Sequence, residues 1–188
     1  LTREMKTIDV AHLFWYTLEA DGSLKGRTYV DPQLVATLKQ NGVKVIPTVT
    51  DGFKSGRARA IFADPNKRAQ HILDIVDLVD KKGYDGIDLD YEAVGSTGRN
   101  AFSSFVEDLA VELHRKNKLL SITVYPKTSS PGRWSTGKSH DYGRIGAAAD
   151  RVNIMSYGYG SSGGSPNPIG PVHYLEKIYA FATTKIPA

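Results

Sequence analysis

The sequence predicts an α/β domain in which parallel strands alternate with helical crossovers. Three observations indicate this class. Strand-like and helix-like patterns alternate along the whole chain, the helices have recognisable capping residues, and polar side chains gather where strands end. With 188 residues and 40% apolar side chains, the chain can bury one substantial core, so a single domain is expected.

The first two strand–helix units are marked by the ends of their helices. A strand at residues 8–16 precedes a helix in which Asp31 is the expected N-cap and Pro32 occupies the first turn, and an Asn-Gly pair ends that helix. The second unit has the same plan, with a strand at 43–49 and a helix at 64–83 that begins with Asp-Pro and ends with glycine. Its apolar residues fall on one stripe: Ile72, Ile75, Val76 and Val79.

Three more strands are expected, at residues 86–92, 119–125 and 151–157. An amphipathic helix separates the first two of them, with its apolar side chains at Phe102, Phe105, Val106, Leu109 and Leu113. A short alanine-rich helix precedes the last strand, and a final helix is expected at roughly 171–184. The Gly- and Ser-rich residues 158–170 are either a long loop over the carboxyl ends of the strands or a simple connector.

Residues 85–92 read Asp-Gly-Ile-Asp-Leu-Asp-Tyr-Glu. Asp88, Asp90 and Glu92 occupy every second position, so three carboxyl groups point to one face of a strand. Neighbouring anions suppress one another's ionisation, and we expect the row to hold a proton near neutral pH on its outermost member, Glu92. A protonated carboxylic acid is what glycoside cleavage needs. Asp85 has the opposite parity and is expected to accept backbone hydrogen bonds.

Metal sites fit this segment poorly. A calcium loop that began at Asp88 would need glycine at its sixth position and glutamate at its twelfth, where the chain has Ala93 and Arg99. A magnesium site stays open as an alternative, although Ile87 and Leu89 alternate with the acids as in a buried strand. A solvated acidic turn is the other alternative. The five histidines show no ligand spacing, so neither a metal ion nor a cofactor is expected.

The octapeptide resembles the Asp-Gly-x-Asp-x-Asp-x-Glu signature of family 18 of the glycoside hydrolases, the chitinase-like TIM barrels. The stretch from Asp64 to Tyr91, and residues 14–16 with 21–24, resemble the subgroup that includes bacterial spore-cortex and cell-wall lytic enzymes. The resemblance implies a (β/α)8 barrel, which typically needs about 250 residues. About five units are visible, so residues 1–188 are expected to be one catalytic domain truncated at both ends, with open edges that favour self-association.

The resemblance also implies a mechanism. Glu92 would be the general acid, and the N-acetyl carbonyl of the substrate, rather than a second carboxylate, would attack the anomeric carbon, with retention of configuration. Asp90 would orient and stabilise the acetamido group, while Asp88 would share a proton with Asp90. The expected substrates are β-1,4-linked glycans that contain N-acetylglucosamine, in chitin or in peptidoglycan.

Residues 155–158, Met-Ser-Tyr-Gly, resemble part of the family's Met-x-Tyr-Asp motif. This implies that Met155 and Tyr157 contact the substrate, whereas Gly158 stands where the family carries an acid. Five aromatic residues are candidates for stacking on sugar rings: Phe14, Trp15, Tyr16, Tyr125 and Trp134. On strict alternation the first and third share one face, and Tyr16 is assigned to the cleft.

The composition limits the choice of partners. A net charge of +4 with scattered Lys and Arg gives little support for a nucleic-acid partner, and no run of about 18 apolar residues suggests a membrane span. The absence of cysteine is compatible with either redox compartment, and the resemblance suggests a secreted, cell-envelope or spore setting. Two other functions remain open: a catalytically silent glycan-binding protein, and an inactive fragment of a barrel.

Overall fold

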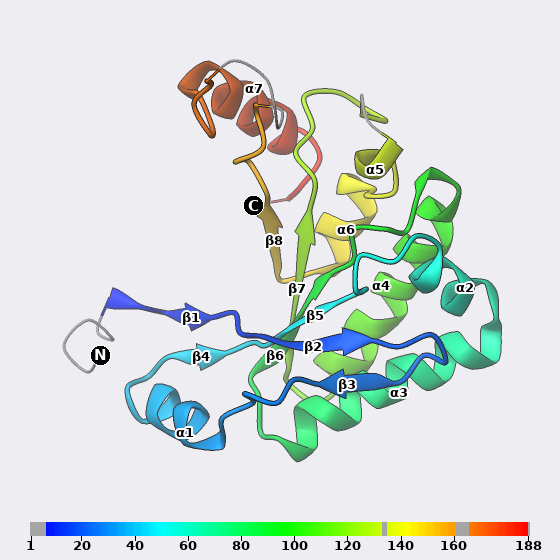
Figure 1. The fold of residues 1–188 in the computed structure, drawn as a ribbon, viewed down its shortest axis with the longest axis vertical. Helices are drawn as coiled ribbons and strands as arrows, with labels where there is room; N and C mark the ends of the chain where they lie inside the picture. Colours follow the sequence, from blue (N-terminus) through cyan, green and yellow to red (C-terminus); the bar gives the residue numbers. More distant parts are fainter. Residues whose placement is uncertain (1–6, 133–134, 161–165, 188) are drawn as a thin grey trace.

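The computed structural model describes residues 7–132, 135–160 and 166–187, which form an open sheet flanked by helices (Figure 1). The sheet has six strands in the order β3-β2-β5-β6-β7-β8. They are β2 (Phe14–Leu18), β3 (Leu24–Gly26), β5 (Thr48–Thr50), β6 (Gly86–Asp90), β7 (Leu119–Val124) and β8 (Arg151–Ile154). Every neighbouring pair is parallel except β2 with β3, which is antiparallel. The predicted α/β class with a parallel sheet is therefore confirmed.

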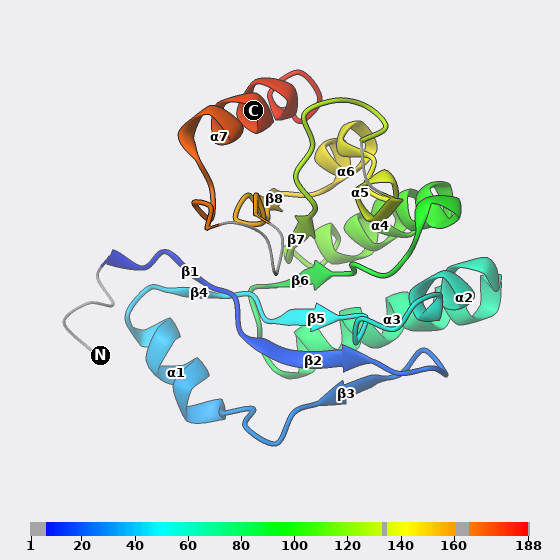
Figure 2. The ribbon, with the colours of Figure 1, turned by 45° about the horizontal axis from the view of Figure 1, so that its top comes forward.

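The described helices are α1 (Pro32–Gln40), α2 (Arg57–Ala63), α3 (Pro65–Lys81), α4 (Arg99–His114), α5 (Ser135–Lys138), α6 (Tyr142–Ala148) and α7 (Val172–Ala182), with a 3-10 turn at Ser96–Gly98. The capping predictions are confirmed, because the side chains of Asp31 and Asp64 accept hydrogen bonds from the backbone N–H groups that open α1 and α3. In Figures 1 and 2, α3 and α4 lie beside the sheet, and α7 lies near β8, far from α1 and β3. No described helix is long and apolar enough to cross a membrane.

The two faces of the sheet differ in polarity. One face packs against the helices with fully buried apolar side chains, which are Val49, Ile87, Leu89, Leu120, Ile122 and Val124. The other face is polar, because the register places Thr48 beside Asp88 and Asp88 beside Ser121. Side chains of successive residues alternate between the faces of a strand, so this pattern divides the core from a polar inner surface.

The predicted strand at 43–49 is split in the structure. A pair of short parallel strands, β1 (Val10–Ala11) and β4 (Lys44–Val45), precedes the main sheet, and the chain passes through Ile46 and Pro47 before β5 begins. Proline has no N–H group to donate to a ladder, which explains the interruption at this point. The hairpin that adds β3 to the sheet and the short helix α2 were not predicted.

Two residues at the start of β6, the strand that carries the acidic row, have structural roles. A Cβ atom added to Gly86 would lie 2.2 Å from the carbonyl oxygen of Leu119, so only glycine allows β6 and β7 to approach this closely. The Asp85 carboxylate accepts a hydrogen bond from the backbone N–H of Val45 at 2.8 Å, which confirms its predicted role as a backbone acceptor.

Candidate active site

The acidic row lies where β6 ends at the polar face of the sheet. Asp88 and Asp90 are almost completely buried, with 2% and 3% of their surface exposed, and Glu92 lies two residues beyond the end of the strand. The carboxylates are close enough that Glu92 and Asp88 both raise the pKa of Asp90. The three acids therefore form one electrostatic unit rather than an exposed turn.

Polar side chains from the neighbouring strands surround Asp88. Its carboxylate accepts hydrogen bonds from Thr48 at 3.0 Å, from Thr123 at 3.3 Å and from the Asn153 amide at 3.3 Å. Burial raises the pKa of Asp88, while hydrogen bonds from Ser121 and these hydroxyl groups act in the opposite direction. The sequence reasoning missed these partners, although their alternation along β5 and β7 was a usable signal.

Asp90 is the member of the row whose pKa rises to about 7, first because of burial and then because of the charges of Glu92, Asp88 and Asp51. Asp90 is almost completely buried, whereas Glu92, to which the sequence analysis assigns the proton, is only partly buried. In addition, Oδ1 of Asp90 is buried and has no hydrogen-bond partner among the described residues.

Asp51, fully buried after β5, holds the backbone around Glu92. Its carboxylate accepts hydrogen bonds from the N–H groups of Ala93 at 2.6 Å and of Phe53 at 3.0 Å. Burial raises the pKa of Asp51, and these hydrogen bonds oppose the shift. Asp51 follows the predicted strand that precedes the acidic row. The sequence reasoning did not use this position as a signal.

A cavity of about 350 Å³ opens beside Glu92. Its lining residues are Glu92, Tyr125, Pro126, Lys127, Gly132, Gly137, Met155, Tyr157, Gly158 and Tyr174. The structure thus brings Met155 and Tyr157 to the same cavity as Glu92. Tyr157 is 65% exposed, and burial together with the charges of Asp90 and Glu92 raises its pKa. A Cβ atom added at Gly158 would meet no atom of the described residues within 4 Å.

Tyr125 lies near the side chain of Glu92. Burial, followed by the interaction of its hydroxyl group with Glu92, raises the pKa of Tyr125 well above its usual value. The ring had been one of five stacking candidates in the sequence, without a preferred role. In the structure it lies near Glu92, and both residues line the cavity.

The assignment of Tyr16 to the cleft is wrong. Tyr16 is 4% exposed, and its hydroxyl group forms a buried hydrogen bond with the hydroxyl group of Tyr84 at 2.7 Å. A β-bulge explains the error: Phe14 pairs with Thr48 but Tyr16 pairs with Val49, so strict alternation fails between them. Tyr16 consequently faces the helices, and its strand neighbour Phe14, 50% exposed, lies on the polar face. Trp134, another candidate, lies outside the described residues.

No group of three or more His, Cys, Asp or Glu side chains in the described part of the chain is arranged to hold a metal ion. What the arrangement offers is acid–base chemistry. A partly buried carboxyl group at a cavity, a second one that can hold a proton near neutral pH, and a third in a hydrogen-bonded cradle follow one another along a single line.

Comparisons with known proteins agree with this geometry. The model of the glycosyl hydrolases family 18 matches residues 11–184. A cortical fragment-lytic enzyme of Bacillus anthracis is 29% identical over 185 residues, which is 95% of this chain and 42% of that protein. The chain therefore spans less than half the length of this curated relative.

Solved structures resemble the fold closely. The crystal structure of a chitinase from Chromobacterium violaceum ATCC 12472 superposes with a TM-score of 0.91 and 25% identity, covering 100% of this chain and 60% of that chain. The spore cortex-lytic enzyme SleL of Bacillus cereus gives a TM-score of 0.88 with 26% identity, covering 98% of this chain and 43% of the other.

Proposed function

Because the chain belongs to family 18 of the glycosyl hydrolases, we propose that its protein hydrolyses β-1,4 linkages next to N-acetylglucosamine in a glycan. The observation that carries the proposal is the row of three carboxyl groups that ends at a cavity beside Glu92. The reaction needs no cofactor in this proposal. Both chitin and peptidoglycan contain the required sugar, and the printed names of the relatives include chitinases and cortex-lytic enzymes.

In the proposed reaction Glu92 donates its proton to the glycosidic oxygen as the bond to the anomeric carbon breaks. The acetamido carbonyl oxygen of the same sugar attacks the anomeric carbon and forms a cyclic oxazolinium ion. Water then attacks the anomeric carbon, the bond from that carbon to the acetamido oxygen breaks and the N-acetyl group is restored, and the water gives a proton to the Glu92 carboxylate, which restores the acid. Two displacements at one carbon retain its configuration.

Asp90 is proposed to stabilise the acetamido group. Its buried Oδ1 has no partner in the described structure, so it is free to accept a hydrogen bond from the acetamido N–H. A carboxylate at this position also stabilises the positive charge that develops on the oxazolinium ring. Since the pKa of Asp90 is about 7, proton exchange between Asp90 and Asp88 is within reach at neutral pH.

Tyr157 and Met155 are proposed to contact the reacting sugar. Both line the cavity beside Glu92, and the largely exposed Tyr157 hydroxyl group can donate a hydrogen bond to the acetamido carbonyl. Gly158 favours a second function, that of a glycan-binding protein without turnover. The family usually carries an acid at this position, and glycine supplies no carboxylate there. The intact row with Glu92 favours the enzyme.

The test is release of a fluorogenic reporter from N,N′-diacetylchitobioside by the full protein and by its Glu92→Gln variant. We expect turnover to fall by at least about 100-fold in the variant, because glutamine cannot donate the proton. Glu112→Gln is the matched control, since Glu112 pairs with Arg115 on the surface of α4. Full activity in Glu92→Gln would refute the mechanism, and binding of chitooligosaccharides without turnover in the wild-type protein would select the binding function.

A further inference from the structure

His140 is a fully buried histidine that lies between the carboxyl ends of β6 and β7. Its Nδ1 atom accepts a hydrogen bond from the backbone N–H of Tyr125 at 3.0 Å, and its Nε2 atom lies 3.1 Å from the carbonyl oxygen of Tyr91. An amide N–H can only donate and a carbonyl can only accept, so one tautomer satisfies both partners. The ring is neutral, with its proton on Nε2.

The environment of His140 favours this neutral form. Burial lowers the pKa of its imidazole to about 4, the carbonyl of Tyr91 opposes that shift, and the nearby cations Lys127 and Arg99 lower the pKa further. Protonation at Nδ1 would replace the acceptor by a donor that faces the Tyr125 N–H. The ring can therefore perform its bridging role only as the neutral base.

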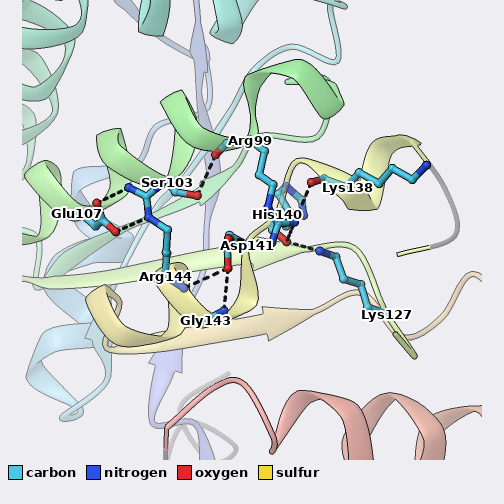
Figure 3. A network of polar contacts seen from close by, with 9 residues as sticks. All are labelled: Arg99, Ser103, Glu107, Lys127, Lys138, His140, Asp141, Gly143 and Arg144. Atoms are coloured by element: carbon cyan, nitrogen blue, oxygen red, sulfur yellow. Dashed lines mark hydrogen bonds and ion pairs between the residues drawn. The ribbon is translucent and has the colours of Figure 1, made fainter. Parts of the chain in front are cut away.

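The backbone of His140 is also held in place (Figure 3). Its carbonyl oxygen accepts hydrogen bonds from the ammonium group of Lys127 and from Arg99. Arg99 in turn pairs with the carboxylate of Asp141 at 2.8 Å and donates to the carbonyl oxygen of Lys138 at 3.0 Å. These contacts join α4, the β7 end and the start of α6, so the imidazole cannot shift without breaking several of them.

The two strand ends bridged by the ring carry groups of the candidate active site. Tyr91 directly precedes Glu92 in the chain, and Tyr125 lines the same cavity as Glu92, whose charge raises the pKa of the Tyr125 hydroxyl group. The last Cα partners of β6 and β7 are Leu89 and Ile122, and both bridged residues lie beyond that pair. The imidazole thus connects the two strands where their own ladder has ended.

We propose that His140 is a positioning residue, which ties the end of β6 to the end of β7 and thereby holds the Glu92 carboxyl group against the Tyr125 hydroxyl group. This inference rests on the proposed role of Glu92 as the general acid. Positioning of an acid affects the rate of the chemical step more than substrate binding, because a misplacement of about 1 Å can cost on the order of 100-fold in rate.

Three substitutions of His140 distinguish the effect of its hydrogen bond with Tyr125 from the effect of its hydrogen bond with Tyr91. His140→Phe keeps a flat ring but removes both hydrogen bonds. His140→Asn places an acceptor where Nδ1 lies and retains the bond from Tyr125, whereas His140→Gln places a donor near Nε2 and retains the bond to Tyr91. We expect kcat to fall at least about 10-fold in His140→Phe with KM changed less than about 3-fold, and partial recovery in the two amide variants.

Ile145→Ala is the matched control, because Ile145 is fully buried in α6 and its truncation weakens the same region without touching the ring. We expect it to lower the melting temperature while kcat stays within about 3-fold of the wild-type value. If His140→Phe does not fold, His140→Asn and His140→Gln test the inference by the same criterion, a loss of kcat with little change in KM.

Wild-type kcat in folded His140→Phe, or a loss confined to KM, would overturn the inference. So would equal losses of kcat in His140→Phe and Ile145→Ala. Glu92→Gln is measured in parallel: if it remains active, the proposed function fails, whereas an inactive Glu92→Gln beside an unaffected His140→Phe overturns only the positioning role.

Discussion

Mild acid should destabilise the protein through His71, a fully buried histidine in α3. Its Nδ1 atom lies 2.8 Å from the carbonyl oxygen of Gly22, and its Nε2 atom lies 2.8 Å from the hydroxyl group of Tyr91. The carbonyl can only accept, so Nδ1 carries the proton and Nε2 accepts from the tyrosine. Burial lowers the pKa of His71 to about 4, with the Gly22 carbonyl acting in the opposite direction.

The sign of the effect follows from proton binding. A histidine in the unfolded chain has a pKa of about 6.5, so the unfolded state binds this proton first as the pH falls. The contribution of neutral His71 to stability is complete above that pKa and is lost as the pH falls toward 4. Between pH 7 and pH 4.5 the two pKa values give a loss of about 2 kcal/mol in the free energy of unfolding.

Urea unfolding of the wild-type protein and of His71→Gln at both pH values isolates this contribution. Carboxyl groups with raised pKa values, such as Asp90, act in the opposite direction, but they are present in both proteins and cancel in the comparison. We expect the pH-dependent loss to be about 2 kcal/mol smaller in His71→Gln. His173→Gln, at an exposed position, should behave as wild type. Equal losses in the wild-type protein and His71→Gln would refute the reasoning.

Three further predictions follow from the geometry. Gly86→Ala should lower the free energy of unfolding by about 2–4 kcal/mol in urea titrations, because its Cβ would lie 2.2 Å from the Leu119 carbonyl oxygen. Gly158→Asp should fold with an unchanged melting temperature, since its Cβ meets no atom within 4 Å in the part of the chain that the structure describes, and should raise turnover of the chitobioside. Asp51→Asn should lower kcat at least about 10-fold, because the backbone N–H of Ala93, next to Glu92, loses a carboxylate acceptor, and unchanged kcat would contradict this.

Helix ends could be predicted from the sequence because their causes are local. Asp31 and Asp64 cap α1 and α3 with their own side chains, two and three residues from the N–H groups that they satisfy. The acidic row is equally local, since period-two spacing in a strand places Asp88 and Asp90 on one face whatever the rest of the fold does.

The errors arose where the outcome depends on a partner strand. The bulge between Phe14 and Tyr16 is defined by their pairing with β5, so it leaves no mark in the alternation of β2 itself. The raised pKa of Asp90 likewise depends on depth in the folded molecule, which spacing does not report. Asp51 and His140 lie 42 and 49 residues from the backbone groups of Ala93 and Tyr91 that they bind, far beyond any local pattern.

The chain between Tyr125 and His140 begins and ends at the same hydrogen bond, from the Tyr125 N–H to the imidazole. Lys127 also binds the His140 carbonyl oxygen, so the end of β7 and the start of α6 are joined by two contacts that do not depend on the chain between them. Gly132 and Gly137 within this stretch line the cavity. If the proposed function holds, substitutions at these two glycines would reshape the sugar site while the hydrogen bonds of His140 stay in place.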